Sequence, residues 1–463
     1  MKMRHRRDID ILGGPMLKNM LLFAIPLAAS SVLQLLFNAA DTVVVGRFAG
    51  ADQLAAVGAT SSTVNLIVNL CVGFSIGANV LVARRIGEKN TEGAIRAVHT
   101  SMALSVLLGI IAGVAGYLFS VPLLRMINTP SDILPSAAAY LRAYFVGVPA
   151  SIIYNFGASI LRAKGDSTRP LYFLTAAGVI NILLNLLFVI GFGMGAVGVG
   201  IATAASQIVS AVLVVLCLLR EHSIVRVSLQ KIRFYKKEVL DIIGIGLPAG
   251  LQSCLFNISN IIVTSSINSF NSAAVVAGNS AASSLEGFVS GALTAFYQTQ
   301  MTFGGQNYGA GKLDRIDRGL FVSSACVVVG GVVLGGLLWI FGVPLLSIYT
   351  TDPEVVGFGM IRISYMALSM IINGVMNTFM GSIRSMGYSF LTMGVTLFGA
   401  CGLRILWIYT VFAANPTLAN VYIAYPITWL TTLCMHAVCY FVVRKRERRR
   451  FASREAASPK LDV

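Results

Sequence analysis

Long apolar stretches separated by short polar connections dominate this chain. Twelve of them are long enough to cross a membrane as helices, since a span needs about 20 mostly apolar residues. Their length and number favour helices over the short alternating strands of a transmembrane barrel. We therefore predict an all-α integral membrane protein with twelve transmembrane helices, at approximately 17–45, 54–81, 98–122, 134–161, 171–191, 195–219, 241–267, 275–304, 319–343, 356–383, 389–412 and 417–443.

Composition agrees with this assignment. The chain is 56% hydrophobic and 12% charged, and its mean hydropathy is +0.78. A soluble protein carries about 25% charged residues. Two of the predicted boundaries rest on short breaks, because only GFGMG divides 171–219 and only AANPT divides 389–443.

The net charge of +16 is unevenly distributed. Most Lys and Arg residues fall in alternate connections, whereas the opposite connections hold Arg47, Arg125 and several acidic residues. This positive-inside pattern predicts that both termini lie in the cytoplasm. We interpret the basic tail as an anchor that contacts anionic lipid rather than nucleic acid. The basic segments are MKMRHRRD, ARRIGEKNTEGAIR, LRAKGDSTRP, REHSIVRVSLQKIRFYKKE, GAGKLDRIDR, SIRSMG and RKRERRRFASR.

The second half of the sequence repeats the first half at one constant offset. Pro26 then aligns with Pro248, Asn38 with Asn260, and VPLLRMINT with VPLLSIYTT. Each half has an even number of spans, so both halves enter the membrane from the same side as parallel repeats. Transporters of this design hold their substrate between two halves that move against each other. The predicted domains are an N-terminal bundle 1–219, a basic linker 220–240, a C-terminal bundle 241–443 and a basic cytoplasmic tail 444–463.

Asp41 is one of two acidic residues inside the apolar stretches. A carboxylate at membrane depth is costly and by default marks an ion pathway or a binding site. Gln34, Asn38 and Asp41 have i, i+4 and i+7 spacing, which places them on one face of a helix. Access to water on alternate sides would change the balance of desolvation and hydrogen bonding that sets the pKa of such a carboxyl. The repeat aligns Val263 with Asp41, so coupling through this carboxylate is expected to favour the N-terminal half.

Glu286 is the second acidic residue inside a span, and three interpretations remain open. It is a second coupling carboxylate, a contact for a cationic substrate, or a structural partner of an intramembrane arginine. Asn65 and Asn257 are further candidates for a substrate site. The arginines available for pairing are Arg142, Arg362 and Arg404.

Pro26 and Pro248 lie inside spans at matched positions of the repeat. Each removes a backbone hydrogen bond, which predicts either helix bending during gating or a static kink. The sequence has no P-loop, no HExxH and no Cys/His cluster with ligand spacing, so we predict no enzyme activity and no cofactor. Transport would then be driven by an ion gradient or by the concentration gradient of the substrate itself.

Several segments resemble the multidrug and toxic compound extrusion (MATE) family over nearly the whole chain. They are IPLAASSVLQLLFNAADTVVVGRF, FSIGANVLVARRIGEKN, NILLNLLFV, GAVGVGIATAASQ and MTFGGQNYGAGK. The resemblance implies a V-shaped pair of six-helix bundles. It also implies export of amphipathic, often cationic drugs by antiport with H⁺ or Na⁺, and function as a monomer.

The resemblance also implies that Asp41 is the coupling residue and acts with Asn181, Asn185 and Thr203. The family often has NxxxD in the fifth span, whereas this chain has Asn181 followed by Asn185. With one negative charge fewer, the site favours H⁺, although Na⁺ at Asp41 stays open. Asn and Gln in membrane bundles also join helices by hydrogen bonds, which is the alternative role for these amides.

Two alternatives to drug antiport remain. A flippase for a lipid-linked precursor would need basic residues lining its cavity, whereas the inward polar residues here are mostly amides with two acids. A passive channel or a receptor would not need a titratable group within its first span.

Overall fold

The computed structural model describes residues 9–457, without the side chains of residues 51, 62, 63 and 454–457. The predicted N-terminal segment MKMRHRRD and the last six residues lie outside the described residues. The elements of the first half are α1 (Met16–Phe48), α2 (Ala51–Gly87), α3 (Thr91–Leu118), α4 (Ser120–Met126), α5 (Leu134–Lys164), α6 (Thr168–Asn185), η1 (Leu186–Gly191), α7 (Gly195–Leu219) and η2 (Leu229–Lys231). Those of the second half are α8 (Lys236–Asn268), α9 (Ala273–Gly309), α10 (Leu313–Ile340), α11 (Gly342–Leu346), α12 (Pro353–Met366), α13 (Ser369–Ser385), α14 (Ser389–Thr396), η3 (Leu397–Gly402), α15 (Leu403–Trp407), η4 (Ile408–Phe412) and α16 (Leu418–Ala457).

The predicted all-α membrane fold is confirmed, and each predicted span coincides with a helix or a broken helix. Within the described residues, ten helices are long and apolar enough to cross a membrane. The pair α12 and α13 forms an eleventh candidate, bent by 45°. Helix α9 is the remaining one of the twelve; it has 37 residues and is rich in Ser, Asn and Gln, which lowers its hydropathy.

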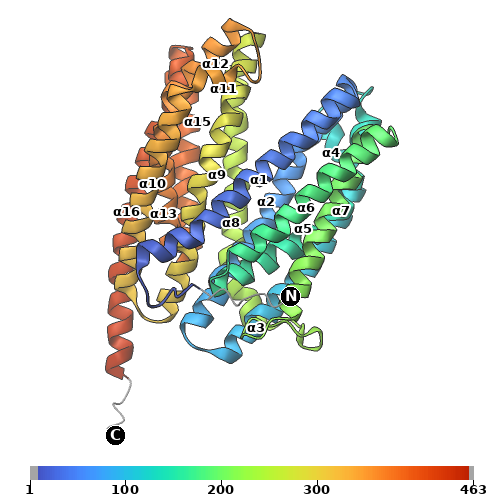
Figure 1. The fold of residues 1–463 in the computed structure, drawn as a ribbon. Coiled ribbons are helices and arrows are strands. Elements are labelled where there is room, and N and C mark those ends of the chain that lie inside the picture. Colours follow the sequence, from blue (N-terminus) through green and yellow to red (C-terminus); the bar gives the residue numbers. More distant parts are fainter. Residues whose placement is uncertain (1–8, 458–463) are drawn as a thin grey trace. The chain divides into compact units, whose positions relative to one another are not determined.

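The described chain divides into two compact units. The first contains residues 25–86 and 90–254, and the second contains residues 10–24, 87–89 and 255 onward. In Figure 1 most helices of the first unit are coloured blue to green, and most of those of the second unit yellow to red. In this division the start of α1 belongs to the second unit and the start of α8 to the first.

Helix α5 is central to the first unit and packs on α3 and α7, while α6 also packs on α7. Small residues allow these helices to approach closely, as they do in many membrane bundles. A Cβ atom at Gly147 would lie 2.5 Å from the Cα of Ala204. A larger residue at Gly147 would therefore push α5 away from α7.

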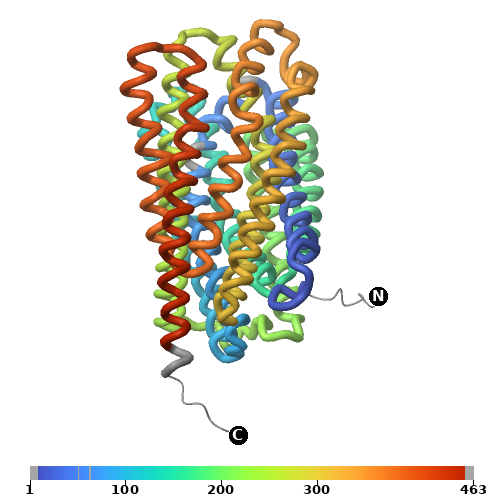
Figure 2. The backbone as a smooth tube through the Cα atoms, turned by 90° about the vertical axis from the view of Figure 1, so that its left-hand side faces the viewer, coloured from blue at the N-terminus to red at the C-terminus, as the bar shows by residue number. Residues whose placement is uncertain are grey.

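In the second unit, α9 packs on α10, α12 and α13, and α13 also packs on α16. Figure 2 shows these helices running alongside one another. Gly278 of α9 faces α12, and a Cβ atom there would lie 2.6 Å from the carbonyl oxygen of Val355. Both units thus use glycine at close helix contacts.

Matched glycines end matched helices in the two halves. Gly165 follows α5 with φ of 108°, and Gly387 lies just after α13 with φ of 90°. Both are in the left-handed region that favours glycine. The offset of the repeat aligns these two glycines with each other, so the repeat extends to the backbone conformation of a connection.

Helices α1 and α8 continue through Pro26 and Pro248 without a break. The hydroxyl of Ser30 donates to the carbonyl oxygen of Pro26 at 2.8 Å. The residues of α1 change from the second unit to the first between Ala24 and Ile25, next to Pro26. Bending at these prolines during transport stays a prediction.

Helix α16 is longer than the predicted span, since it continues through the basic tail to Ala457. Hydrogen bonds within the second unit hold this extension: Tyr308 and Tyr388 donate to the buried Glu447 at 2.7 and 2.6 Å. Arg444 donates to Asp314 at 2.7 Å. The tail is therefore helical over 444–457, and in Figures 1 and 2 it continues past the α9–α10 connection.

Candidate functional site

Asp41 lies in the last third of α1, where its carboxylate contacts α6. The Nδ2 atom of Asn185 donates to Oδ1 of Asp41 at 2.5 Å. Asn185 is fully buried, whereas Asp41 is only partly exposed. The contact joins residues 144 positions apart in the chain, so the helix packing of the first unit creates it.

A chain of hydrogen bonds continues from Asn185 into the first unit. The same Nδ2 atom donates to Oδ1 of Asn181 at 3.2 Å, and Nδ2 of Asn181 donates to the hydroxyl of Thr203 at 3.4 Å. The order Asp41–Asn185–Asn181–Thr203 links α1, α6 and α7. These four are the polar residues that the family resemblance placed together.

The amide orientation of Asn185 follows from this network. Its nitrogen faces two acceptors, which leaves its buried Oδ1 with no hydrogen-bond donor among the described residues. An oxygen of this kind beside a carboxylate is a suitable acceptor for a protonated acid or a small hard cation. Helix α6 changes to the π-helical segment η1 directly after Asn185, and such segments are frequent at functional sites.

Tyr140 and Tyr144 of α5 also lie beside Asp41, and the sequence analysis missed them. Both phenols interact electrostatically with the Asp41 carboxylate. Their ring centres are 6.3 Å apart, and Tyr140 packs in one apolar cluster with Val44 and Val45 of α1. Their i, i+4 spacing in YLRAYF was the available signal, since it places two phenols on one helix face.

Gln34 and Asn38 do not join this network. Both side chains are exposed and have no hydrogen bond within the described residues. They lie earlier on α1 than Asp41, on the face that their spacing predicted. Within residues 9–457, no group of three or more His, Cys, Asp or Glu residues is placed to hold a metal ion. The Asp41 site therefore offers one carboxylate with amide and hydroxyl oxygens.

Glu286 forms a buried ion pair with Arg362 in the second unit. Nε and Nη2 of Arg362 donate to the two carboxylate oxygens at 2.8 and 2.7 Å. Nη1 of Arg362 donates to Asn279 at 2.6 Å. Glu286 is 4% exposed and Arg362 is 6% exposed. Of the three interpretations, the geometry favours structural pairing, because both carboxylate oxygens of Glu286 face one guanidinium.

The other candidate residues lie away from strong polar contacts. Asn257 of α8 is partly exposed and has no hydrogen bond to Glu286, and Asn65 of α2 is exposed. Arg142 is exposed and lies over the ring of Tyr117 at 5.7 Å. Of the three candidate arginines, Arg362 is thus the one that pairs with Glu286.

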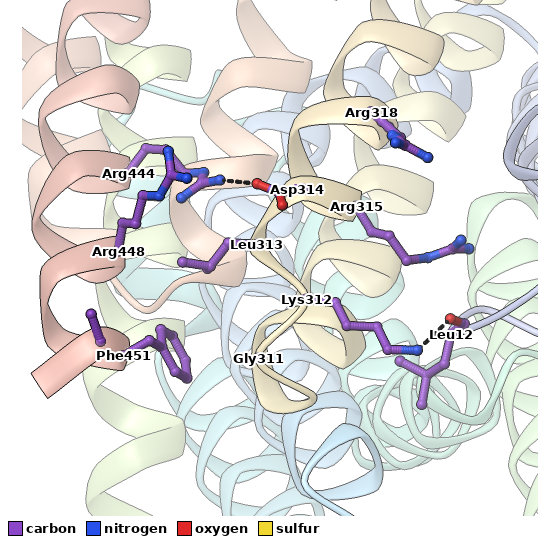
Figure 3. A pocket seen from close by; sticks show the side chains of 11 residues that line it. Leu12, Gly311, Lys312, Leu313, Asp314, Arg315, Arg318, Arg444, Arg448 and Phe451 are labelled. Atoms are coloured by element: carbon purple, nitrogen blue, oxygen red, sulfur yellow. Dashed lines mark hydrogen bonds and ion pairs between the residues drawn. The ribbon is translucent and has the colours of Figure 1, made fainter. Parts of the chain in front are cut away.

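A basic cavity of about 600 Å³ lies in the second unit, near the ends of α10 and α16. Figure 3 shows its arginines and lysine around the opening, with Arg444 bound to Asp314 and Lys312 bound to the carbonyl of Leu12. The cavity is far along α16 from the buried ion pair of Glu286. Its lining includes Lys312, Arg315, Arg318, Arg444, Arg448 and Phe451.

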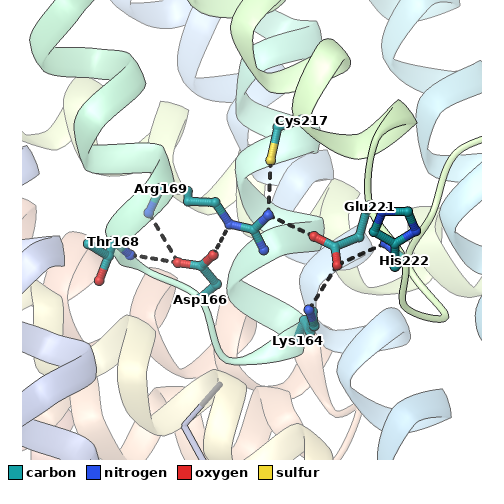
Figure 4. Close-up of polar contacts among 7 residues, drawn as sticks. All are labelled: Lys164, Asp166, Thr168, Arg169, Cys217, Glu221 and His222. Atoms are coloured by element: carbon teal, nitrogen blue, oxygen red, sulfur yellow. Dashed lines mark hydrogen bonds and ion pairs between the residues drawn. The ribbon is translucent and has the colours of Figure 1, made fainter. Parts of the chain in front are cut away.

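A second polar cluster closes the connections after α5 and α7 of the first unit (Figure 4). Lys164 and Arg169 donate to the two carboxylate oxygens of Glu221 at 3.1 and 2.7 Å. Asp166 accepts from Arg169 and caps the first turn of α6. Burial opposes the ionisation of Glu221, but the two cations outweigh it and lower its pKa from 4.5 to about 2.

We expect Glu221 to make the stability of this connection dependent on acid pH. A carboxyl whose pKa is lowered by folding stabilises the folded state above its unfolded pKa, and the contribution is lost as the pH falls toward the folded value. Hydrogen exchange of residues 220–235 should therefore lose protection between about pH 4.5 and 2. The Glu221→Gln variant should lack this component of the pH dependence, and an identical profile in both proteins would contradict it.

This chain is similar to a protein family, to curated proteins and to solved structures. The MatE family model matches residues 26–187 and 248–410. The two matches begin at Pro26 and Pro248, which agrees with the alignment of these prolines in the repeat. A Bacillus subtilis protein named as a probable multidrug resistance protein, YpnP, is 28% identical over 82% of this chain and 84% of its own length.

A second relative, from Shewanella oneidensis, is named as an FAD transporter. It is 27% identical over 77% of this chain and 78% of its own length. Among solved structures, one of a MATE protein in complex with MaL6 is 20% identical, with a TM-score of 0.90 over 96% of this chain and 99% of that one. At that identity the likeness supports the fold.

Proposed function

This chain belongs to the MatE family of membrane transporters, and on that premise we propose that it exports amphipathic, mainly cationic organic compounds by antiport with protons. As a member of a transporter family it is a multi-pass membrane transporter and not an enzyme. The relatives named as multidrug resistance proteins support the cargo class. The observation that carries the coupling mechanism is the hydrogen-bonded chain from Asp41 through Asn185 and Asn181 to Thr203.

In the proposed cycle Asp41 binds and releases the coupling proton. Asn185 donates to the ionised carboxylate at 2.5 Å, and its unpartnered Oδ1 could accept from the protonated form after an amide flip. The amide network can thus hold Asp41 in either state. Proton uptake removes the negative charge that holds Asn185 and α6 against α1, which links protonation to a change in the first unit.

The coupling ion is proposed to be H⁺ rather than Na⁺. The Asp41 site has a single carboxylate, since Asn185 takes the position where the family often has a second acid. Na⁺ binding depends on several hard oxygen ligands, and it is strengthened by negative charge. Na⁺ at Asp41 remains the alternative, with Asn185, Asn181 and Thr203 as its oxygen ligands. No other cofactor is proposed.

The membrane orientation is part of the proposal. Both termini are proposed to lie on the cytoplasmic side of the bacterial inner membrane. The reason is that they belong to the same set of alternate connections as most of the Lys and Arg residues. The basic cavity near Arg444 and Arg448 would then contact anionic lipid headgroups. No nucleic-acid contact is proposed, and the monomer is the proposed functional unit.

Efflux by the purified protein in liposomes tests the function and its driving ion. Ethidium transport is measured with a pH gradient alone and with a Na⁺ gradient alone. Transport under the pH gradient alone is expected, because a protonatable carboxyl needs no Na⁺. Transport under the Na⁺ gradient alone would identify Na⁺, and not H⁺, as the coupling ion. A wild-type protein that moves ethidium at the same rate with no gradient is a passive channel, and one that moves no cation favours the lipid-precursor flippase.

A further inference from the structure

The second unit contains a buried cation without an acidic partner. Arg404 of α15 is fully buried, and its Nη1 atom donates to Oδ1 of Asn260 at 3.0 Å. Its Nε and Nη2 atoms have no acceptor in the part of the chain that the structure describes. A buried charge is normally paired, because burying it alone costs a large desolvation energy. Arg362 shows the usual solution, since it is held by Glu286.

Aromatic rings enclose this guanidinium. The Cζ atom of Arg404 lies 4.2 Å from the ring centre of Tyr425, 5.3 Å from that of Phe256 and 6.0 Å from that of Trp429. Cation–π attraction offsets part of the cost of burial, but it satisfies no N–H group in the guanidinium plane. The indole N–H of Trp429 is also buried and has no acceptor among the described residues. One cluster thus holds three unpartnered donor atoms within residues 9–457.

The free edge of Arg404 has the geometry that binds a carboxylate. Nε and Nη2 lie side by side in the guanidinium plane, and two parallel N–H bonds from that edge match the two oxygens of a carboxylate. Arg362 uses the same pair of atoms to hold Glu286. An intramolecular example of the proposed interaction therefore exists in the same unit, where both guanidiniums contact the ring of Tyr425.

The repeat aligns Arg404 with a residue of the helix turn that carries the amides of the Asp41 network. Its offset aligns Arg404 with Ile182, in the helix turn between Asn181 and Asn185, and aligns η4 with η1. Arg404 lies between two π-helical segments, η3 and η4, and such segments often mark functional sites. Its partner Asn260 aligns with a residue of α1, the helix that carries Asp41 in the first unit. Matched regions of the repeat thus hold a carboxylate in the first half and a guanidinium in the second.

We propose that the Arg404 cluster binds the carboxylate of an aromatic organic compound. The carboxylate would accept from Nε and Nη2 of Arg404 and from the indole N–H of Trp429, and the aromatic body would lie against Tyr425. Asn260 and Phe256 are partly exposed, whereas the guanidinium is fully buried, so a ligand would have to enter from their side. If the proposed export function holds, Arg404 binds the carboxylate of the cargo.

Equilibrium dialysis of the purified full-length protein tests the site with matched probes. They are 1-naphthoate, 1-naphthyl phosphate and 1-naphthylmethylammonium, which share one aromatic body. Wild type is expected to bind naphthoate most tightly. Arg404→Gln should weaken naphthoate binding by about tenfold or more, since it removes a charged two-bond contact, and Arg404→Lys should give an intermediate loss. Equal binding of naphthoate and the ammonium probe, or unchanged binding by Arg404→Gln, overturns the proposal.

Two tryptophan variants keep the test valid if the arginine variants fail to fold. Trp429→Phe removes the unpartnered N–H, whereas Trp407→Phe removes an N–H that donates to the carbonyl of Asn420 at 2.9 Å. Weaker naphthoate binding by Trp429→Phe but not by Trp407→Phe supports the proposal, and equal effects overturn it. Preference of wild type for the phosphate probe overturns the carboxylate assignment.

This experiment is independent of the coupling mechanism. Dialysis needs no gradient, and the probes bind or fail to bind whether or not Asp41 carries a proton. If the protein binds naphthoate but shows no gradient-driven efflux, the Arg404 site is supported and the antiport proposal is rejected. If the protein shows gradient-driven efflux but does not bind naphthoate, antiport is supported and the Arg404 site is rejected.

Discussion

Replacing Asp41 with asparagine is expected to reduce gradient-driven ethidium efflux to the rate of protein-free liposomes. The variant keeps the shape of the side chain but has no proton to release at any working pH. Asp41 is the carboxylate that accepts from Asn185, and the repeat offers only Val263 in its place in the second half. No second acid in that network can therefore take over the proton. Efflux under a pH gradient in wild-type and variant liposomes measures the effect.

The matched control is Asp132→Asn, because Asp132 is an exposed residue of the connection before α5. Its efflux should equal that of wild type. Ethidium binding by Asp41→Asn without a gradient separates loss of coupling from loss of folding. Undiminished efflux in Asp41→Asn, with the protein at normal abundance in the membrane, would exclude Asp41 as the coupling residue.

The positions of the helices could be predicted from the sequence because the membrane imposes them. A spanning helix must be apolar over about 20 residues and must satisfy its own backbone hydrogen bonds. Even α9, whose hydropathy is low, was identifiable, since its polar residues are scattered among Ala, Val and Phe. The basic tail was different. Its charges suggested a connection. The hydrogen bonds of Glu447 and Asp314 that keep it helical form only in the folded unit.

The candidate site could be predicted only in part. The i, i+4 pair Asn181 and Asn185 and the intramembrane Asp41 were visible as polar exceptions in apolar runs. Tyr140 and Tyr144 were not, because tyrosine is common in membrane helices and two phenols carry no charge. The partner of Glu286 was also undetermined, since three arginines were available and the choice depends on the face that α12 presents to α9.

The repeat illustrates the same limit. Its offset aligns Asn38 with Asn260, yet Asn38 is exposed and Asn260 accepts from the buried Arg404. Equivalent backbone positions therefore have different side-chain environments. The alignment of η1 with η4 shows that the repeat preserves helix geometry, while the charges placed on that geometry have diverged.

Glu286→Gln is expected to destabilise the second unit by about 3–5 kcal/mol, the usual cost of removing one partner from a buried ion pair. Arg362 would keep its charge in a site where both residues are less than a tenth exposed, with Asn279 and the new neutral amide oxygen as its acceptors. Thermal or chemical unfolding of the purified protein, followed by a probe in α9 or α12, measures the loss. Glu354→Gln is the control, since Glu354 is exposed at the start of α12 and its loss should change stability little.

The double variant Glu286→Leu with Arg362→Met distinguishes a structural pair from a coupling carboxylate. Replacing both charges with apolar groups of similar size removes the unpaired cation, so most of the lost stability should return. If Glu286 serves structure alone, this variant should also retain gradient-driven efflux, because Asp41 remains in place. A stable double variant without efflux would instead assign Glu286 a direct part in transport. An unchanged unfolding free energy in Glu286→Gln would mean that the pair with Arg362 contributes no net stability.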